Sequence, residues 1–236
     1  MTVNLPEDLT ARLEMLQERG FARLPGLVDP ATACTLADLY PDPDRFRSRV
    51  VMQRHAYGSG EYKYFADPLP DPVAALRRTL YPHLAPVANR WAARLSRPNA
   101  DPLPTFPPDL DTWLDRCHAA GQVRPTPLLL RYGAGDYNRL HQDLYGDLWF
   151  PIQLVVMLSA PTDYTGGDFI LTETRARMQS RAESLRLAQG EGLLFAVNSR
   201  PVASSRGWSR AAMRHGVSTV ESGQRATLGV IFHDAR

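Results

Sequence analysis

Lysine is almost absent from this chain of 236 residues, since all but one of its 27 basic residues are arginine. Chemistry that requires a lysine, such as a P-loop or a Schiff base, therefore has one candidate, and Lys63 lies in no motif of either kind. Cysteine is also scarce. Cys34 and Cys117 stand far apart in unlike contexts, which excludes a disulfide framework and a cysteine-rich zinc site.

Long apolar runs and an excess of one charge are missing as well. No apolar stretch reaches the roughly 18 residues of a membrane span, and the start MTVNLPEDL lacks the pattern of a signal peptide. We therefore expect a cytoplasmic protein with no membrane partner. A net charge of +2 indicates neither a nucleic-acid nor a membrane partner. The sequence indicates no oligomeric state.

The residue pattern of the sequence changes near Pro125. Helical patterns cover 5–19, 29–39, 70–95 (with a break expected at Pro82) and 109–120, with short strands at 21–28 and within 47–66. A proline-rich linker is expected over 97–108. After Pro125, short β-type runs alternate with turn signals, over 127–132, 137–144, 150–158, 168–172, 192–197, 213–220 and 225–232.

This layout predicts one α+β domain over 1–236. Residues 1–125 would form a helical support, and residues 126–236 a β-barrel core.

The tripeptide His141-Gln142-Asp143 carries the first chemical signal. Alternate residues of a strand point to one face about 6.5–7 Å apart, so this imidazole and carboxylate can reach one metal ion. Taken alone, the pair is more simply a strand histidine beside an exposed aspartate. His215, on a later β-type run, completes two histidines and one carboxylate. That set suits non-haem Fe(II), although hydrolytic zinc sites also use it.

Arg225 chooses between these metals. It follows His215 by ten residues, across a Glu221-Ser-Gly turn, so a hairpin can return it to the same cavity. A guanidinium inside a small barrel requires an anion and binds a carboxylate through two parallel hydrogen bonds. Thr227 lies on the same face and offers a hydroxyl. The simpler alternative is an exposed arginine at a strand edge.

The stretch Arg131–Phe232, within the C-terminal 111 residues, resembles the Fe(II)- and 2-oxoglutarate-dependent dioxygenases of the prolyl-hydroxylase-like type. The matching segments, in family order, are Tyr132-Gly-Ala-Gly-Asp, His141-Gln-Asp143, Ile152–Leu158, Gly166-Gly-Asp-Phe, Gly192-Leu-Leu-Phe, Arg214-His215-Gly-Val and Gly223-Gln-Arg225. The resemblance implies a double-stranded β-helix, or jelly-roll barrel. It also implies that His141, Asp143 and His215 bind iron and catalyse, and that Arg225 holds the distal carboxylate of 2-oxoglutarate. Tyr132 matches a tyrosine that contacts this cosubstrate.

Further motifs resemble one bacterial subfamily described as predicted oxidative demethylases of alkylated nucleic acid. They are His141–Gly146, Thr165-Gly-Gly-Asp-Phe, Arg177-Met-Gln-Ser-Arg181, Arg200-Pro, Arg206-Gly and Ile231-Phe-His-Asp234. The last arginine, however, follows the spacing of prolyl hydroxylases. It does not match the two-arginine ending of the better-known nucleic-acid demethylases.

The resemblance also implies the reaction. O₂ and 2-oxoglutarate are consumed, succinate and CO₂ are released, and an unactivated C–H bond is hydroxylated; ascorbate is a candidate reductant. Oxidation of an N-methyl group would end in formaldehyde and the demethylated amine. Asp143 favours hydroxylation over halogenation, because related halogenases lack this carboxylate.

Four residues are candidate substrate contacts. Arg175 and Arg181 lie in an arginine-rich polar stretch, Trp208 precedes the second histidine, and His233 ends the last run. The alternatives are a solvated loop for the arginines and a packing role for Trp208.

Three functions remain open at this stage. The first is a dioxygenase of a small molecule, amino acid or peptide. The second is the same chemistry on an alkylated base, which the charge of +2 makes less favoured. The third is a non-catalytic, cupin-like metal-binding module.

Overall fold

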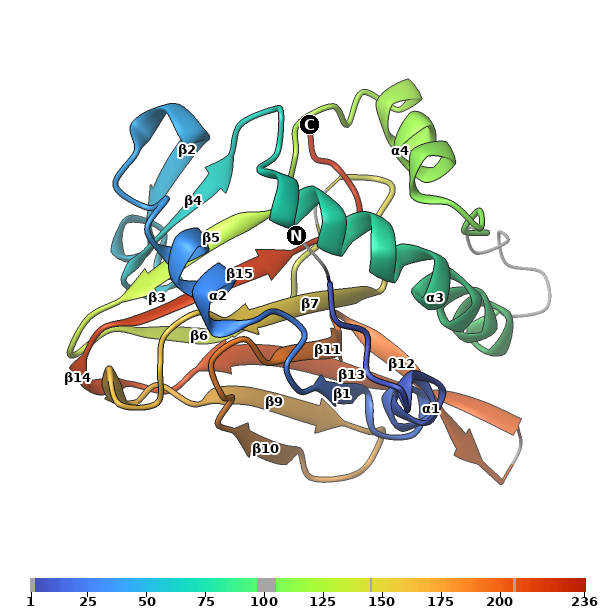
Figure 1. Cartoon of the computed structure of the whole chain (residues 1–236). Coiled ribbons are helices and arrows are strands. Elements are labelled where there is room, and N and C mark those ends of the chain that lie inside the picture. Colours follow the sequence, from blue (N-terminus) through green and yellow to red (C-terminus); the bar gives the residue numbers. More distant parts are fainter. Residues whose placement is uncertain (1–2, 97–104, 145, 206) are drawn as a thin grey trace.

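The computed structural model describes residues 3–96, 105–144, 146–205 and 207–236 (Figure 1). Its α-helices are α1 (Leu9–Arg19), α2 (Pro30–Ala37), α3 (Asp71–Leu95) and α4 (Leu110–Ala119), with two short 3₁₀ helices, η1 (Pro43–Arg45) and η2 (Met52–His55). The strands are β1 (Phe21–Leu24), β2 (Phe46–Val51), β3 (Gly58–Ser59), β4 (Glu61–Phe65), β5 (Leu128–Tyr132), β6 (Tyr137–His141), β7 (Ile152–Met157), β8 (Tyr164–Gly166), β9 (Phe169–Thr174), β10 (Arg181–Leu185), β11 (Gly192–Ala196), β12 (Ser199–Ser204), β13 (Gly207–Val217), β14 (Val220–Gly223) and β15 (Arg225–Val230).

Two antiparallel sheets organise the described residues. The larger has the order β1-β11-β7-β15-β5-β4-β2. The smaller has the order β10-β9-β13-β6-β3, with β12 also paired to β13, and β14 pairs separately with β8. The expected class of helices with antiparallel sheet is confirmed.

The helices cover the outer face of the larger sheet, and Figure 1 shows α2 and α3 in front of β15 and β7. Strand β7 separates two cores because its side chains alternate between faces. Leu154 and Val156 pack with the helices, where α3 contributes Leu80 and Trp91. Val155 and Met157 point to the other side, into a second cluster between the sheets. The functional cavity lies on this inner side.

Helix α3 runs through Pro82 without the predicted break. A proline inside a helix lacks the N–H that bonds the preceding turn, which normally destabilises the helix. Here the residues around it, including Tyr81 and Leu84, are fully buried against the sheet. Packing of this apolar face outweighs the local backbone preference.

The first 125 residues supply more than helical support. Strand β1 pairs with β11, and β4 pairs with β5, so the N-terminal segment completes both ends of the larger sheet. Strand β3 joins the smaller sheet through β6. The helix expected at 109–120 is found as α4, capped by Asp109. Most of the predicted linker lies outside the described residues. Among the helices that the structure describes, none has the length and apolar character needed to cross a membrane.

Candidate functional site

A cavity of about 430 Å³ opens between the two sheets. Strands β5, β6, β7, β13 and β15 supply most of its wall. Its polar lining residues are Tyr57, Tyr62, Tyr132, Asn138, Arg139, His141, Gln142, Asp143, Gln153, His215, Arg225 and Thr227.

Three side chains converge at one end of this cavity. His141 is the last residue of β6 and pairs directly with His215 of β13. Asp143 lies just after β6, which ends earlier than the sequence suggested. The Asp143 carboxylate lies 3.4 Å from Nε2 of His141 and 3.3 Å from Nε2 of His215. One ligand atom from each residue falls within 4.8 Å of the others, close enough to surround one metal ion.

Neighbouring groups orient these imidazoles. Nδ1 of His141 donates to the carbonyl of Arg139 (2.7 Å), which turns Nε2 toward Asp143. The ring of His215 packs against Phe195 and Phe169, with centroids 4.7 and 5.9 Å away. The two histidines are thus held before any metal binds.

The electrostatics of the cluster suit a cation. Burial disfavours a charge on Asp143, but its hydrogen bonds and charge interactions with both histidines hold the pKa of this carboxyl well below its usual value. Burial and the neighbouring His141 lower the pKa of His215. For His141, burial acts to lower the pKa, yet the hydrogen bond and charge of Asp143 raise it above the ordinary value. An ionised carboxylate beside a neutral imidazole is the form that metals bind.

Arg225 occupies the other end of the cavity. It is 1% exposed, and none of its three guanidinium nitrogens has a hydrogen-bond partner among the described residues. Tyr132 faces it across the β15–β5 pair, with its ring centre 5.5 Å from Cζ. Burial lowers the pKa of Arg225, although the Tyr132 and Tyr164 phenols, a side-chain contact with Tyr164 and the charge of Asp168 counteract this effect. A buried cation without a partner is costly, so the position calls for an anion.

The double glycine before β9 makes room for this arginine. Gly167 has φ +64°, and a Cβ there would come within 2.9 Å of Cδ of Arg225. The predicted partner Thr227 is 1% exposed and lines the same cavity.

Sequence reasoning missed further residues of the site region, among them Tyr164, Asn138 and Gln153. Tyr164 is buried near Arg225, and its hydroxyl donates to Sδ of Met157 (3.6 Å). Asn138 lines the cavity and donates to the Tyr132 hydroxyl (3.4 Å). Gln153 lines the cavity from β7. The sequence feature that could have identified Gln153 is its polar side chain on the inward face of an otherwise apolar strand.

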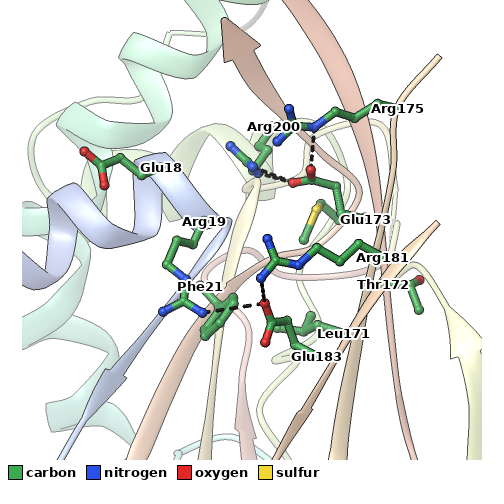
Figure 2. A pocket seen from close by; sticks show the side chains of 11 residues that line it. Glu18, Arg19, Phe21, Leu171, Thr172, Glu173, Arg175, Arg181, Glu183 and Arg200 are labelled. Atoms are coloured by element: carbon green, nitrogen blue, oxygen red, sulfur yellow. Dashed lines mark hydrogen bonds and ion pairs between the residues drawn. The ribbon is translucent and has the colours of Figure 1, made fainter. Parts of the chain in front are cut away.

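The four candidate substrate contacts lie elsewhere. Arg175 and Arg181 line a separate cavity of about 80 Å³, where they pair with Glu173 (2.6 Å) and Glu183 (2.7 Å) (Figure 2). Arg181 belongs to strand β10 rather than to a loop.

Trp208 and His233 are also outside the cavity lining. Trp208 is 46% exposed in another groove, with Cζ of Arg94 4.0 Å from its ring centre. An odd number of positions separates Trp208 from His215 along β13. Because successive residues of a strand alternate between faces, Trp208 faces the other side of the sheet. His233 is buried and accepts a hydrogen bond from the Phe150 N–H through Nδ1.

The cavity mouth carries exposed apolar and aromatic side chains. Tyr57 is 51% and Leu140 47% exposed, and Leu144 lies nearby in the lining. The Tyr57 ring stacks on His55, with centroids 5.3 Å apart. The backbone N–H of Arg139 donates to the Tyr57 carbonyl (2.9 Å), which joins the two segments. We call residues 53–57 and 137–144 the rim; Asp143 is its only acidic residue.

A sequence comparison identifies the family. The model of the family Oxygenase-NA, described as "Oxygenase, catalysing oxidative methylation of damaged DNA", matches residues 60–235. The chain belongs to this family. It is a 2-oxoglutarate- and Fe(II)-dependent oxygenase, hence an oxidoreductase that uses iron and 2-oxoglutarate. The non-catalytic module considered from the sequence does not fit this membership.

Relatives and solved structures agree with this result. The uncharacterized protein Rv2227 of Mycobacterium tuberculosis is 52% identical over 172 residues, 72% of each chain. A Pseudomonas putida prolyl-4-hydroxylase superposes with a TM-score of 0.52 at 13% identity, over 96% of this chain and 98% of that one. A Burkholderia pseudomallei oxidoreductase of the 2OG-Fe(II) oxygenase family also gives 0.52, at 15% identity, over 98% and 94%. The Oxygenase-NA chain thus has the expected double-stranded β-helix fold.

Proposed function

We propose that His141, Asp143 and His215 bind Fe(II), while Arg225 and Thr227 bind the distal carboxylate of 2-oxoglutarate. The observation that carries this proposal is the buried Arg225 guanidinium, which has no hydrogen-bond partner among the described residues and shares its cavity with the two imidazoles and the carboxylate. Tyr132 is a further cosubstrate contact. The metal with 2-oxoglutarate and O₂ supplies the oxidation of an unactivated C–H bond. Ascorbate is the proposed reductant that keeps the iron in its active state.

In this scheme the residues of the chain bind and orient the cosubstrate, and they exclude water from the site. Arg225 offers two parallel donors to a carboxylate, and the buried Thr227 adds a hydroxyl. Phe169 and Phe195 shield His215 from water. In dry surroundings these polar contacts are stronger than in water.

We further propose that the primary substrate is a methylated base of a nucleic acid. The rim supports this class, because it combines the stacked His55 and Tyr57 with exposed Arg54 and Arg139. Flipped or single-stranded bases stack on aromatic rings, while arginines contact the phosphates. The family's printed description points the same way. A net charge of +2 averages over all faces and is a weak guide to one rim.

The reaction balances as a hydroxylation. One oxygen atom of O₂ enters an N–CH₃ group and the other enters succinate, with loss of CO₂ from 2-oxoglutarate. The C–N bond of the resulting N–CH₂OH group then breaks, the hydroxyl proton passes to the nitrogen, and formaldehyde is released. Hydroxylation of a small molecule or peptide at the same site is the competing proposal. We propose a cytoplasmic location, consistent with the two free cysteines.

The decisive experiment is a succinate-release screen with the Fe(II)-loaded protein. DNA oligonucleotides treated with methyl methanesulfonate are compared with untreated oligonucleotides, amino acids and peptides. We expect the methylated DNA to stimulate succinate release and to yield formaldehyde in equal amount. Stimulation by amino acids or peptides alone would overturn the nucleic-acid proposal. Absence of any 2-oxoglutarate turnover would overturn the site.

A further inference from the structure

Gln153 is a buried amide at a position that favours an apolar side chain. It lies on β7, where Val155 and Met157 share its inward face and belong to the apolar cluster between the sheets. Gln153 is 4% exposed, and its Nε2 has no hydrogen-bond partner among the described residues. It nevertheless lines the functional cavity.

Such an amide costs stability in the free protein. A buried donor without a partner loses its hydration and gains nothing in return. Gln122 of the same chain is also fully buried, but its amide donor is satisfied, because Nε2 donates to the carbonyls of Leu148 and Asp234. The unpaired donor of Gln153 inside a binding cavity is explained by a ligand that supplies the hydrogen-bond acceptor.

The strand register places Gln153 at the metal end of the cavity. It pairs with Phe195 of β11, and the Phe195 ring packs on His215. Thr227, which we assign to 2-oxoglutarate, pairs instead with Met157. Four residues along a strand separate these two levels by about 13 Å. Gln153 is therefore placed beside the metal cluster and away from the site of the distal carboxylate.

We infer that Gln153 is a specificity-determining residue, whose Nε2 donates a hydrogen bond to an acceptor atom of the primary substrate. This assignment rests on the proposed function. On a methylated base, the acceptor is a carbonyl oxygen or a ring nitrogen close to the methyl group that is oxidised. The other two side-chain amides of the lining already have partners. Asn138 donates to the Tyr132 hydroxyl, and Gln142 donates to the carbonyls of Asn198 and Met213. Gln153 thus selects substrates that carry an acceptor at this position.

The test uses Gln153→Met, which keeps the length and removes the amide, and Gln153→Glu, which keeps the shape and removes the donor. Gln122→Met is the matched control. Binding of a methyl methanesulfonate-treated oligonucleotide is measured on protein loaded with Mn(II) and 2-oxoglutarate. We expect Kd to rise about tenfold for Gln153→Met and further for Gln153→Glu. The 2-oxoglutarate concentration for half-maximal succinate release should stay within about twofold, since the two ends of the cavity are separate.

Thermal unfolding gives a second readout. Gln153→Met should raise the melting temperature by about 2–4 °C, because an unpaired buried donor is removed. Gln122→Met should lower it, because bonded groups lose their partner. A melting temperature that falls equally in both variants would show that Gln153 has an internal role and would overturn the assignment.

The remaining outcomes separate the assignment from the proposed function. Unchanged oligonucleotide binding by Gln153→Met, with an active wild type, would overturn the role of Gln153 alone. A wild type that releases succinate but does not bind the methylated oligonucleotide would overturn the proposed substrate class, and this assignment with it. A wild type without 2-oxoglutarate turnover would overturn the proposed site itself.

Discussion

His141 and His215 stand directly opposite each other in the antiparallel pair of β6 and β13, with their ring centres 4.2 Å apart. Strand pairing therefore fixes the spacing of two of the three proposed metal ligands. A slip of one residue would turn one imidazole to the opposite face of the sheet. Asp143 completes the cluster from the segment after β6, where it can approach both rings.

Removal of any one of these ligands should abolish the reaction. We expect His141→Ala, Asp143→Ala and His215→Ala each to lower succinate release by at least about 100-fold, because an open three-ligand site cannot lose a ligand and keep its metal in place. His83→Ala, on the exposed side of α3, is the matched control and should behave as the wild type. Full activity in any ligand variant would contradict the proposed site.

Replacement of Arg225 should separate cosubstrate binding from metal binding. Arg225→Gln is expected to raise the 2-oxoglutarate concentration for half-maximal succinate release by at least about 30-fold, since a buried charged hydrogen bond is lost. Mn(II) affinity without 2-oxoglutarate should be unchanged. Arg214→Gln, on the exposed face of β13, serves as the control. An unchanged requirement for 2-oxoglutarate would show that the anion binds elsewhere.

The rim should show the salt dependence of phosphate contacts. If Arg139 contacts a phosphate, Arg139→Ala should weaken binding of methylated oligonucleotides and reduce the slope of log K against log salt by about 1. Tyr57→Ala should weaken binding by a stacking loss with little change in that slope. Arg181→Ala, which lies in the separate cavity of Figure 2, is the control. Equal slopes for Arg139→Ala and the wild type would argue against a phosphate contact.

His233 should make the protein less stable in mild acid. Burial lowers the pKa of His233 to about 3 in the folded protein, whereas an unfolded histidine has a pKa of about 6.5. At a pH between these two pKa values, the His233 imidazole is protonated in the unfolded chain but neutral in the folded protein. The free energy of unfolding should therefore fall as pH falls below 6.5, by about 1.4 kcal/mol per pH unit from this group.

Urea unfolding at pH 7.5 and 5.0 measures this effect. His233→Asn should lose this part of the pH dependence, whatever its absolute stability, whereas His83→Asn should keep it. Parallel pH curves for wild type and His233→Asn would contradict the prediction.

Much of the fold was predictable from local patterns. Asp29 caps α2 as its position before Pro30 suggests, and short apolar runs between turn signals marked β5, β7, β11 and β15. Strands β8, β10, β12 and β14 were missed, because short polar or edge strands carry little apolar alternation. The continuity of α3 through Pro82 was missed because burial of that helix, rather than its local sequence, decides its extent.

The sequence by itself determined the chemistry of this protein. A histidine and an aspartate two residues apart, a late histidine and an arginine ten residues on predict a metal site and a carboxylate site, because side-chain identity sets what a group can bind. Tertiary structure decided which other polar residues share that cavity. Arg175, Arg181, Trp208 and His233 lie outside its lining, whereas Gln153 and Tyr57 line it. The physical reason is that strand pairing between distant segments, such as β4 with β5 and β1 with β11, sets which faces meet.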